Sequence, residues 1–169
     1  MLHLKPISRD AVPAALAKAE RYRLLNEPAE AESICRDVLE IDPQNHHARI
    51  TLLLALTDQF GHRRGVSHVH AEKLIADLPD DFERAYYAGL ICERWAKSQL
   101  DGGTPGHVVF EWLHQALEWY EKAEPLSPPG NDDAILRWNT CVRLLQANEH
   151  VRPRDAGVVL ADDFGSDMP

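Results

Sequence analysis

The sequence has little of what a cross-linked or membrane-spanning protein needs. Only three of its 169 residues are cysteines, Cys35, Cys92 and Cys141, and none belongs to a Cys-x-x-Cys pair. An odd and sparse set of cysteines excludes a secreted disulfide framework. Apolar runs are short, as at 52–56, whereas a membrane helix needs about 20 apolar residues. The first residues also lack a long apolar stretch, so we expect no signal peptide and a cytoplasmic location.

Basic side chains are in the minority. The chain has 27 Asp and Glu against 18 Lys and Arg, giving a formal net charge of −9 at pH 7. Because phosphate binding requires clustered Lys and Arg, we expect no nucleic-acid partner, and the short apolar runs favour no membrane partner. The hydrophobic fraction of 44% and charged fraction of 27% are ordinary for one folded domain.

Motifs for catalysis are also missing. There is no Gly-x-Ser-x-Gly and no His-Glu-x-x-His sequence. The glycines at 102, 103 and 106 lack the Lys-Ser/Thr pair that a phosphate-binding loop requires. We therefore expect no catalytic residue, no cofactor and no enzymatic activity.

Apolar residues recur at helical spacing along most of the chain, and the alternation typical of strands is almost absent. Proline and glycine divide this pattern into seven expected helices. They cover about 10–25, a stretch between Pro28 and Asp42, 45–59, 67–78, 81–100, 105–124 and 132–147. We expect one helical domain over 1–150, followed by a mobile acidic tail over 151–169, which lacks helical periodicity.

A repeat motif stands near the end of the sixth expected helix. Ala116, Tyr120, Ala123 and Pro128 follow one another at intervals of four, three and five residues. This small-x3-aromatic-x2-small-x4-Pro pattern resembles the tetratricopeptide repeat, and Gly89 stands where that pattern has a glycine in its first helix. In such repeats the small residues lie where the two helices of a pair cross closely. Proline ends the second helix.

The resemblance covers about 12–147 and implies an all-α superhelix of about three helical hairpins with a C-terminal capping helix. The implied repeats are 12–45, 46–81 and 82–130, followed by a helix at 131–147. No pair can bury its own apolar face, so stacking creates the core. Ala15 and Ala19 stand where the family has tryptophan and glycine. A helical bundle without repeats is the alternative.

In tetratricopeptide proteins, the first helices of the pairs line a groove that holds a segment of a partner. The resemblance therefore implies an adaptor or scaffold that binds another protein or peptide. It places on this face Leu16, Glu20, Arg23, His47, Ile50, Leu54, Tyr86, Leu90, Arg94, Asn139 and Arg143, with Thr57, Glu93 and Ile135 beside them. The apolar members could instead pack in the core. The lysines of the carboxylate clamp found in some members are missing here. The three cysteines fall at core positions, where a thiol is inert.

The segment 62–70 is a second candidate site. Arg63 and Arg64 precede an expected helix, where guanidinium groups and free N–H groups suit a phosphate or an acidic peptide. His62, His68 and His70 raise the possibility of a metal, but the last two point apart on a helix and no third ligand is fixed by spacing. The alternative function is therefore a regulatory subunit that binds a small ligand, an anion or a metal. A solvated loop is the simpler interpretation.

Aromatic residues are dense in the expected third hairpin. They are Trp95, Phe110, Trp112, Trp119 and Tyr120. They either pack around the glycine-rich turn or leave an apolar end exposed for self-association.

Overall fold

All regular structure in the described part of the chain is helical. The computed structural model describes residues 2–62 and 65–154, and these contain no strand. The α-helices are α1 (Val12–Leu24), α2 (Pro28–Ile41), α3 (His46–Thr57), α4 (His68–Glu72), α5 (Asp81–Asp101), α6 (Gly106–Ala123) and α7 (Asp133–Ala147). Short 3-10 turns are η1 (Arg9–Ala11), η2 (Ile75–Asp77) and η3 (Glu124–Leu126). The all-α prediction is confirmed.

Local sequence explains where three of these helices begin. Pro28 occupies the first turn of α2, where its missing N–H is not needed. The Asn45 side chain accepts a hydrogen bond from the amide of Ala48 at 2.9 Å, and Asp80 does the same for Glu83 at 2.9 Å. These bonds satisfy amides that have no partner inside α3 and α5.

The fourth helix departs from the prediction, because α4 is only five residues long, less than half the expected length. Pro79 disfavours helical geometry at Leu78, which is extended with ψ 127°. Arginines from neighbouring segments bind the last two carbonyl groups before Pro79. Arg49 donates to the carbonyl oxygen of Asp77 at 2.7 Å, and Arg84 donates to that of Leu78 at 2.6 Å.

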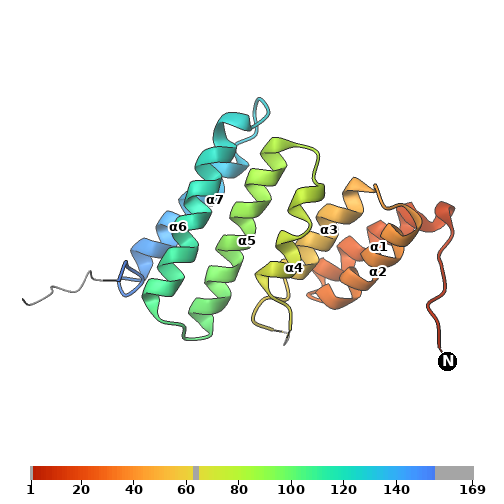
Figure 1. Cartoon of the computed structure of the whole chain (residues 1–169), viewed down its shortest axis with the longest axis horizontal. Coiled ribbons are helices and arrows are strands. Elements are labelled where there is room, and N and C mark those ends of the chain that lie inside the picture. Colours follow the sequence, from red (N-terminus) through yellow and green to blue (C-terminus); the bar gives the residue numbers. More distant parts are fainter. Residues whose placement is uncertain (1, 63–64, 155–169) are drawn as a thin grey trace, which may run out of the picture.

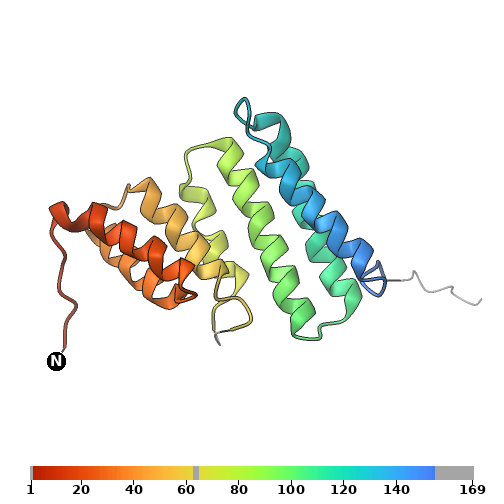
Figure 2. The same ribbon diagram turned by 180° about the vertical axis from the view of Figure 1, so that it is seen from behind.

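The helices form two layers. Figure 1 shows α2, α4 and α6 on one face, and Figure 2 shows α1, α3, α5 and α7 on the opposite face. We call them the even-numbered layer and the odd-numbered layer. Each helix contacts the next along the chain; in addition α1 contacts α3, α3 contacts α5, and α5 contacts α7. The odd-numbered layer is therefore continuous from one end of the molecule to the other.

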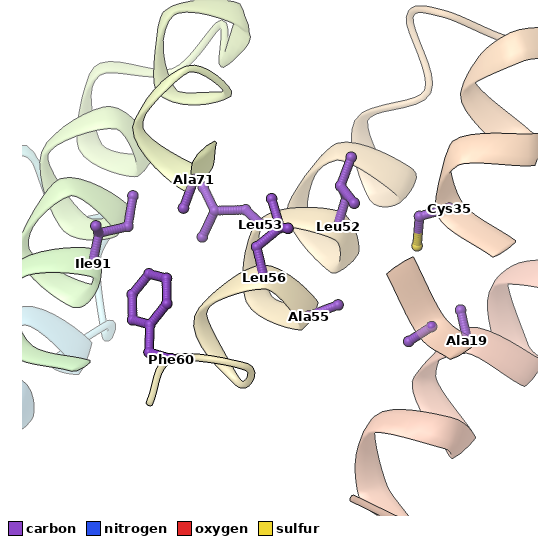
Figure 3. Close-up of a cluster of buried hydrophobic side chains, with 10 residues drawn as sticks. Ala19, Cys35, Leu52, Leu53, Ala55, Leu56, Phe60, Ala71 and Ile91 are labelled. Carbon is purple, nitrogen blue, oxygen red and sulfur yellow. The ribbon is translucent and has the colours of Figure 1, made fainter. Parts of the chain in front are cut away.

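Two main apolar clusters fill the space between the layers. The first joins α1 to α5 and includes Ala19, Cys35, Leu53, Ala71 and Ile91 (Figure 3). The second joins α5, α6 and α7 and consists of Cys92, Ala96, Val109, Leu113, Ala116, Tyr120, Cys141 and Val151. All three cysteines are buried in these clusters, as expected from the sequence. Small residues at the crossings let the helices approach closely.

The packed body extends beyond α7. Val151 is 5% exposed and belongs to the second cluster, one residue past the domain boundary predicted from the sequence. A Cβ atom at Gly106, the first residue of α6, would overlap the carbonyl oxygen of His150. The turn after α7 therefore packs directly on the start of α6. The remaining tail, 155–169, lies outside the described residues.

Gly89 and Tyr120 mark the close crossing of α5 and α6. A Cβ atom at Gly89 would lie 2.7 Å from Cε1 of the Tyr120 ring. The sequence pattern had placed a small residue and an aromatic residue at these two positions.

We predict that Gly89→Ala lowers the free energy of unfolding by about 1–2 kcal/mol, because overpacking outweighs the helix preference of alanine. The Tyr120 ring is 1% exposed and its hydroxyl is bonded to Glu93 at 2.7 Å, so it has little room to move. Urea unfolding followed by circular dichroism measures the change. Gly102→Ala is the control, since its φ of −77° suits alanine and its Cβ would lie 3.2 Å from the Ser98 carbonyl oxygen but would meet no buried ring. A Gly89→Ala protein more stable than the unaltered chain would contradict the close crossing.

Candidate functional site

The predicted groove residues all lie on α1, α3, α5 and α7, but their exposure differs. Leu16 and Leu90 are only 6% and 1% exposed, so they belong to the core and offer a partner no surface. Partly buried members are Arg23, Ile50, Leu54, Tyr86, Arg94 and Asn139; exposed members are Glu20, His47 and Arg143. The odd-numbered layer thus carries partly exposed apolar side chains as well as polar ones.

Asp58, just after α3, holds two of the predicted arginines. The Nε of Arg23 on α1 donates to Asp58 Oδ2 at 2.7 Å, and Arg94 on α5 donates to Asp58 Oδ1. Arg94 also donates to the hydroxyl of Thr57 at 2.7 Å. These side chains are 21–24% exposed. The carboxylate therefore links three helices of the layer, and both guanidinium groups are fixed by it.

Two histidines at the start of α3 make similar lateral contacts. His47 Nε2 lies 2.6 Å from Glu20 Oε1 on α1, and His46 Nε2 lies 3.0 Å from Glu83 Oε1 on α5. Polar contacts therefore join α3 to both neighbours at its start as well as at its end.

Glu93 lies in the core instead of on the predicted face. Its side chain is 0% exposed and accepts hydrogen bonds from the Tyr120 hydroxyl at 2.7 Å, from Lys97 at 2.5 Å and from Arg137 at 3.4 Å. Burial, followed by the nearby Glu93 carboxylate, raises the pKa of Tyr120. The group joins α5, α6 and α7. The helical pattern of the sequence does not reveal this buried carboxylate, because its hydrogen-bond donors lie on three different helices, α5, α6 and α7.

Three adjoining pockets open where α3 ends. The largest, about 520 Å³, lies between the α1–α2 turn and the end of α3, and its polar lining includes Glu27, Glu30, Asp58 and His62. Two others, of about 390 and 180 Å³, lie between the end of α3 and the end of α5. All three share His62. The sequence places His62 in the basic loop and gives no sign that it lies beside the start of α2 and the end of α5.

The basic-loop candidate is only partly described. Arg63 and Arg64, the predicted anion site, lie outside the described residues. The His68 ring contacts two indole rings and Glu72, whereas Nδ1 of His70 accepts from the amide of Ser67 at 3.3 Å. The two rings thus have different partners. Over 2–62 and 65–154, no group of three or more His, Cys, Asp or Glu side chains is arranged to hold a metal.

Most of the aromatic group packs inside the molecule. The His68 ring lies between Trp95 and Trp112, with centroid distances of 5.0 and 4.6 Å. Trp119 is the partly open member, 37% exposed, with the Lys122 ammonium 4.3 Å from its ring centroid. Packing between α4, α5 and α6 therefore accounts for the two tryptophans beside His68.

No family model matches this chain, and a comparison with curated proteins also gives no significant match. None of the helices within the described ranges is both long and apolar enough to cross a bilayer.

We predict that the three cysteines react only when the chain unfolds. Burial raises the pKa of each thiol from 9.0 to about 12, and the thiolate is the reactive form. At pH 8 a chromogenic disulfide reagent should therefore label the folded chain slowly. In urea, where the chain is unfolded, it should label all three thiols quickly.

The same shifts make the folded state bind more protons than the unfolded state above pH 9. The three thiols therefore stabilise the folded state fully below pH 9, and this stabilisation is lost as the pH rises towards 12. A single thiol that reacts fast in the folded chain would contradict the buried assignment.

We predict that Asp58→Asn destabilises the chain by about 1–2 kcal/mol, because two partly buried guanidinium groups lose their shared anion. A double-mutant cycle with Arg23→Gln, followed by urea unfolding, isolates the link between α1 and α3. Asp101→Asn, at an exposed carboxylate, is the control and should have little effect. Strictly additive effects of Asp58→Asn and Arg23→Gln would show that the contact contributes nothing.

Proposed function

We propose that this chain is an adaptor that binds a segment of another protein across the odd-numbered layer. The observation that carries the proposal is the continuity of this layer. The four helices contact one another in series, and their surface combines partly exposed Ile50, Leu54 and Tyr86 with charged neighbours. Apolar anchors within a polar rim are typical of protein interfaces.

A tetratricopeptide-like superhelix is the finer fold that we propose. The pairs α1/α2, α3/α4 and α5/α6 would be its hairpins and α7 its capping helix. The contacts α1–α3, α3–α5 and α5–α7 support this arrangement, as does the close approach of Gly89 to Tyr120. The short α4 differs from the tetratricopeptide pattern, because the second helix of the second hairpin is only five residues long.

The charges of the layer favour a partner segment that carries an acidic side chain among apolar ones. Arg23 and Arg94 share the single carboxylate of Asp58, so these three side chains together carry one positive charge. The chain as a whole has a net charge of −9. The arginines are already held in place, so binding would require little further ordering of their side chains. We propose binding without catalysis, in the cytoplasm.

A small-ligand role is the second candidate, and the pockets around His62 favour it. The largest, about 520 Å³, falls within the size range of ligand pockets. Carboxylates from the α1–α2 turn, the start of α2 and the end of α3 line it. A ligand there would contact Glu27 and Glu30, whereas Asp58 is already neutralised by Arg23 and Arg94, so the two glutamates favour a ligand with positive charge or several hydrogen-bond donors.

We predict that Ile50→Glu and Ile135→Glu each abolish partner capture from a lysate of the source cells, because each places a charge on the proposed apolar surface. Val69→Glu, on α4 in the even-numbered layer, is the matched control: Val69 is 44% and Ile135 38% exposed. Quantitative mass spectrometry of the captured proteins gives the readout, and circular dichroism confirms that each variant is folded.

The same experiment includes a chain ending at Arg154, since Val151 is part of the core and an earlier end would remove packing. A partner lost only with this truncation would move the site to the tail. A partner retained by both isoleucine variants would overturn the proposed face. If binding is lost instead with His62→Ala, the pockets become the site.

A further inference from the structure

The segment before α1 forms an extended arm with two unburied leucines. Leu2 and Leu4 are 101% and 90% exposed, and no helix or strand is formed over residues 2–8. Ile7 anchors the base of the arm, because it packs on the small cluster formed by Leu16, Val38 and Ala48. Burying a leucine side chain stabilises a contact by about 1.5–3 kcal/mol, so the arm carries considerable unused binding energy.

No helix of the described part of the chain covers the outer side of the first hairpin. Among the described elements, α1 contacts η1, α2 and α3, and the stack of helices continues only to one side of it (Figure 1). The open side holds a pocket of about 290 Å³ at the base of the arm. Its apolar lining is Ile7, Ala11, Ala14, Ala15 and Ile34, and Lys18 and Asp37 supply its charges.

These features point to one occupant, a second copy of the same chain. Lys18 on α1 and Asp37 on α2 give the pocket one charge of each sign. In a two-fold dimer each surface meets its own copy, so the lysine of one chain can lie opposite the aspartate of the other. The chain as a whole carries −9 and repels its copies, so a pocket whose two charges cancel is a place where two copies can meet.

The arm has the length and the pattern to complete such a contact. In an extended conformation Leu2 and Leu4 would lie on the same side of the segment, about 7 Å apart. Leu2 lies five residues before Ile7, and these five steps can span about 17 Å, so the arm can cross from its own pocket to that of a facing copy.

We propose that two copies of this chain associate through their first hairpins and exchange arms, with Leu2 and Leu4 of each covering the pocket of the other. The proposal is independent of the partner-binding face, because the pocket lies on the outer side of the first hairpin.

Sedimentation equilibrium over a wide range of protein concentration tests the proposal, with any affinity tag at the C-terminal end. The unaltered chain should show a reversible monomer–dimer equilibrium. The double variant Leu2→Ser/Leu4→Ser should weaken dimerisation at least about a hundredfold, since four leucines lose their burial. Leu24→Ser, at another leucine that is 88% exposed, is the matched control and should leave the dimer unchanged.

A charge exchange tests the two-fold pairing separately from folding. Lys18→Asp alone and Asp37→Lys alone should each weaken the dimer about tenfold, because like charges then face each other. The double variant should restore it. A monomer at all concentrations would overturn the proposal, as would a dimer insensitive to the leucine and charge variants. A monomer destabilised by Leu2→Ser/Leu4→Ser would show that each arm covers its own pocket.

Discussion

Each helical pair of this chain leaves apolar side chains that only the next pair can cover. The first cluster shows the constraint directly: Ala19 and Cys35 from the first pair meet Leu53 from α3, and Ile91 reaches the same cluster from α5 (Figure 3). Neither α1/α2 nor α3/α4 encloses a core by itself. The chain must therefore stack its pairs in order, and a continuous layer of odd-numbered helices is the geometric result.

Polar side chains fix the spacing within that layer. Asp58 joins α1, α3 and α5, and buried Glu93 joins α5, α6 and α7. Both carboxylates are satisfied by several donors, as buried or partly buried charges must be. The arginines expected to bind a partner thus also hold the layer together. A partner would meet a surface whose charged groups are already positioned by the fold.

Local features of the sequence were enough to predict most helices. Pro28, Asn45 and Asp80 act on their own first turns, and the intervals around Tyr120 anticipated its close contact with Gly89. The short α4 was missed because Pro79 is the local stop signal, whereas α4 already ends at Glu72 and gives way to the 3-10 turn η2.

The candidate site was less predictable from local signals. The periodic pattern placed Leu16, Leu90 and Glu93 on the right helices, but a helix position alone does not say how deeply neighbours cover it. Arg23 and Arg94 find Asp58 from 35 and 36 residues away. Only the stacking of the helices brings these groups together, so the spacing of residues in the sequence does not predict their ion pairs.

The two proposed surfaces have different consequences for binding. The odd-numbered layer spans the molecule, whereas the pocket containing Lys18 and Asp37 lies on the outer side of the first hairpin. A dimer formed there would leave Ile50 and Ile135, on α3 and α7, available in both copies. Two identical faces on one particle bind a repeated or dimeric partner far more tightly than one face does, because the second contact is intramolecular. Self-association would then set the strength of partner binding without adding any contact to the face itself.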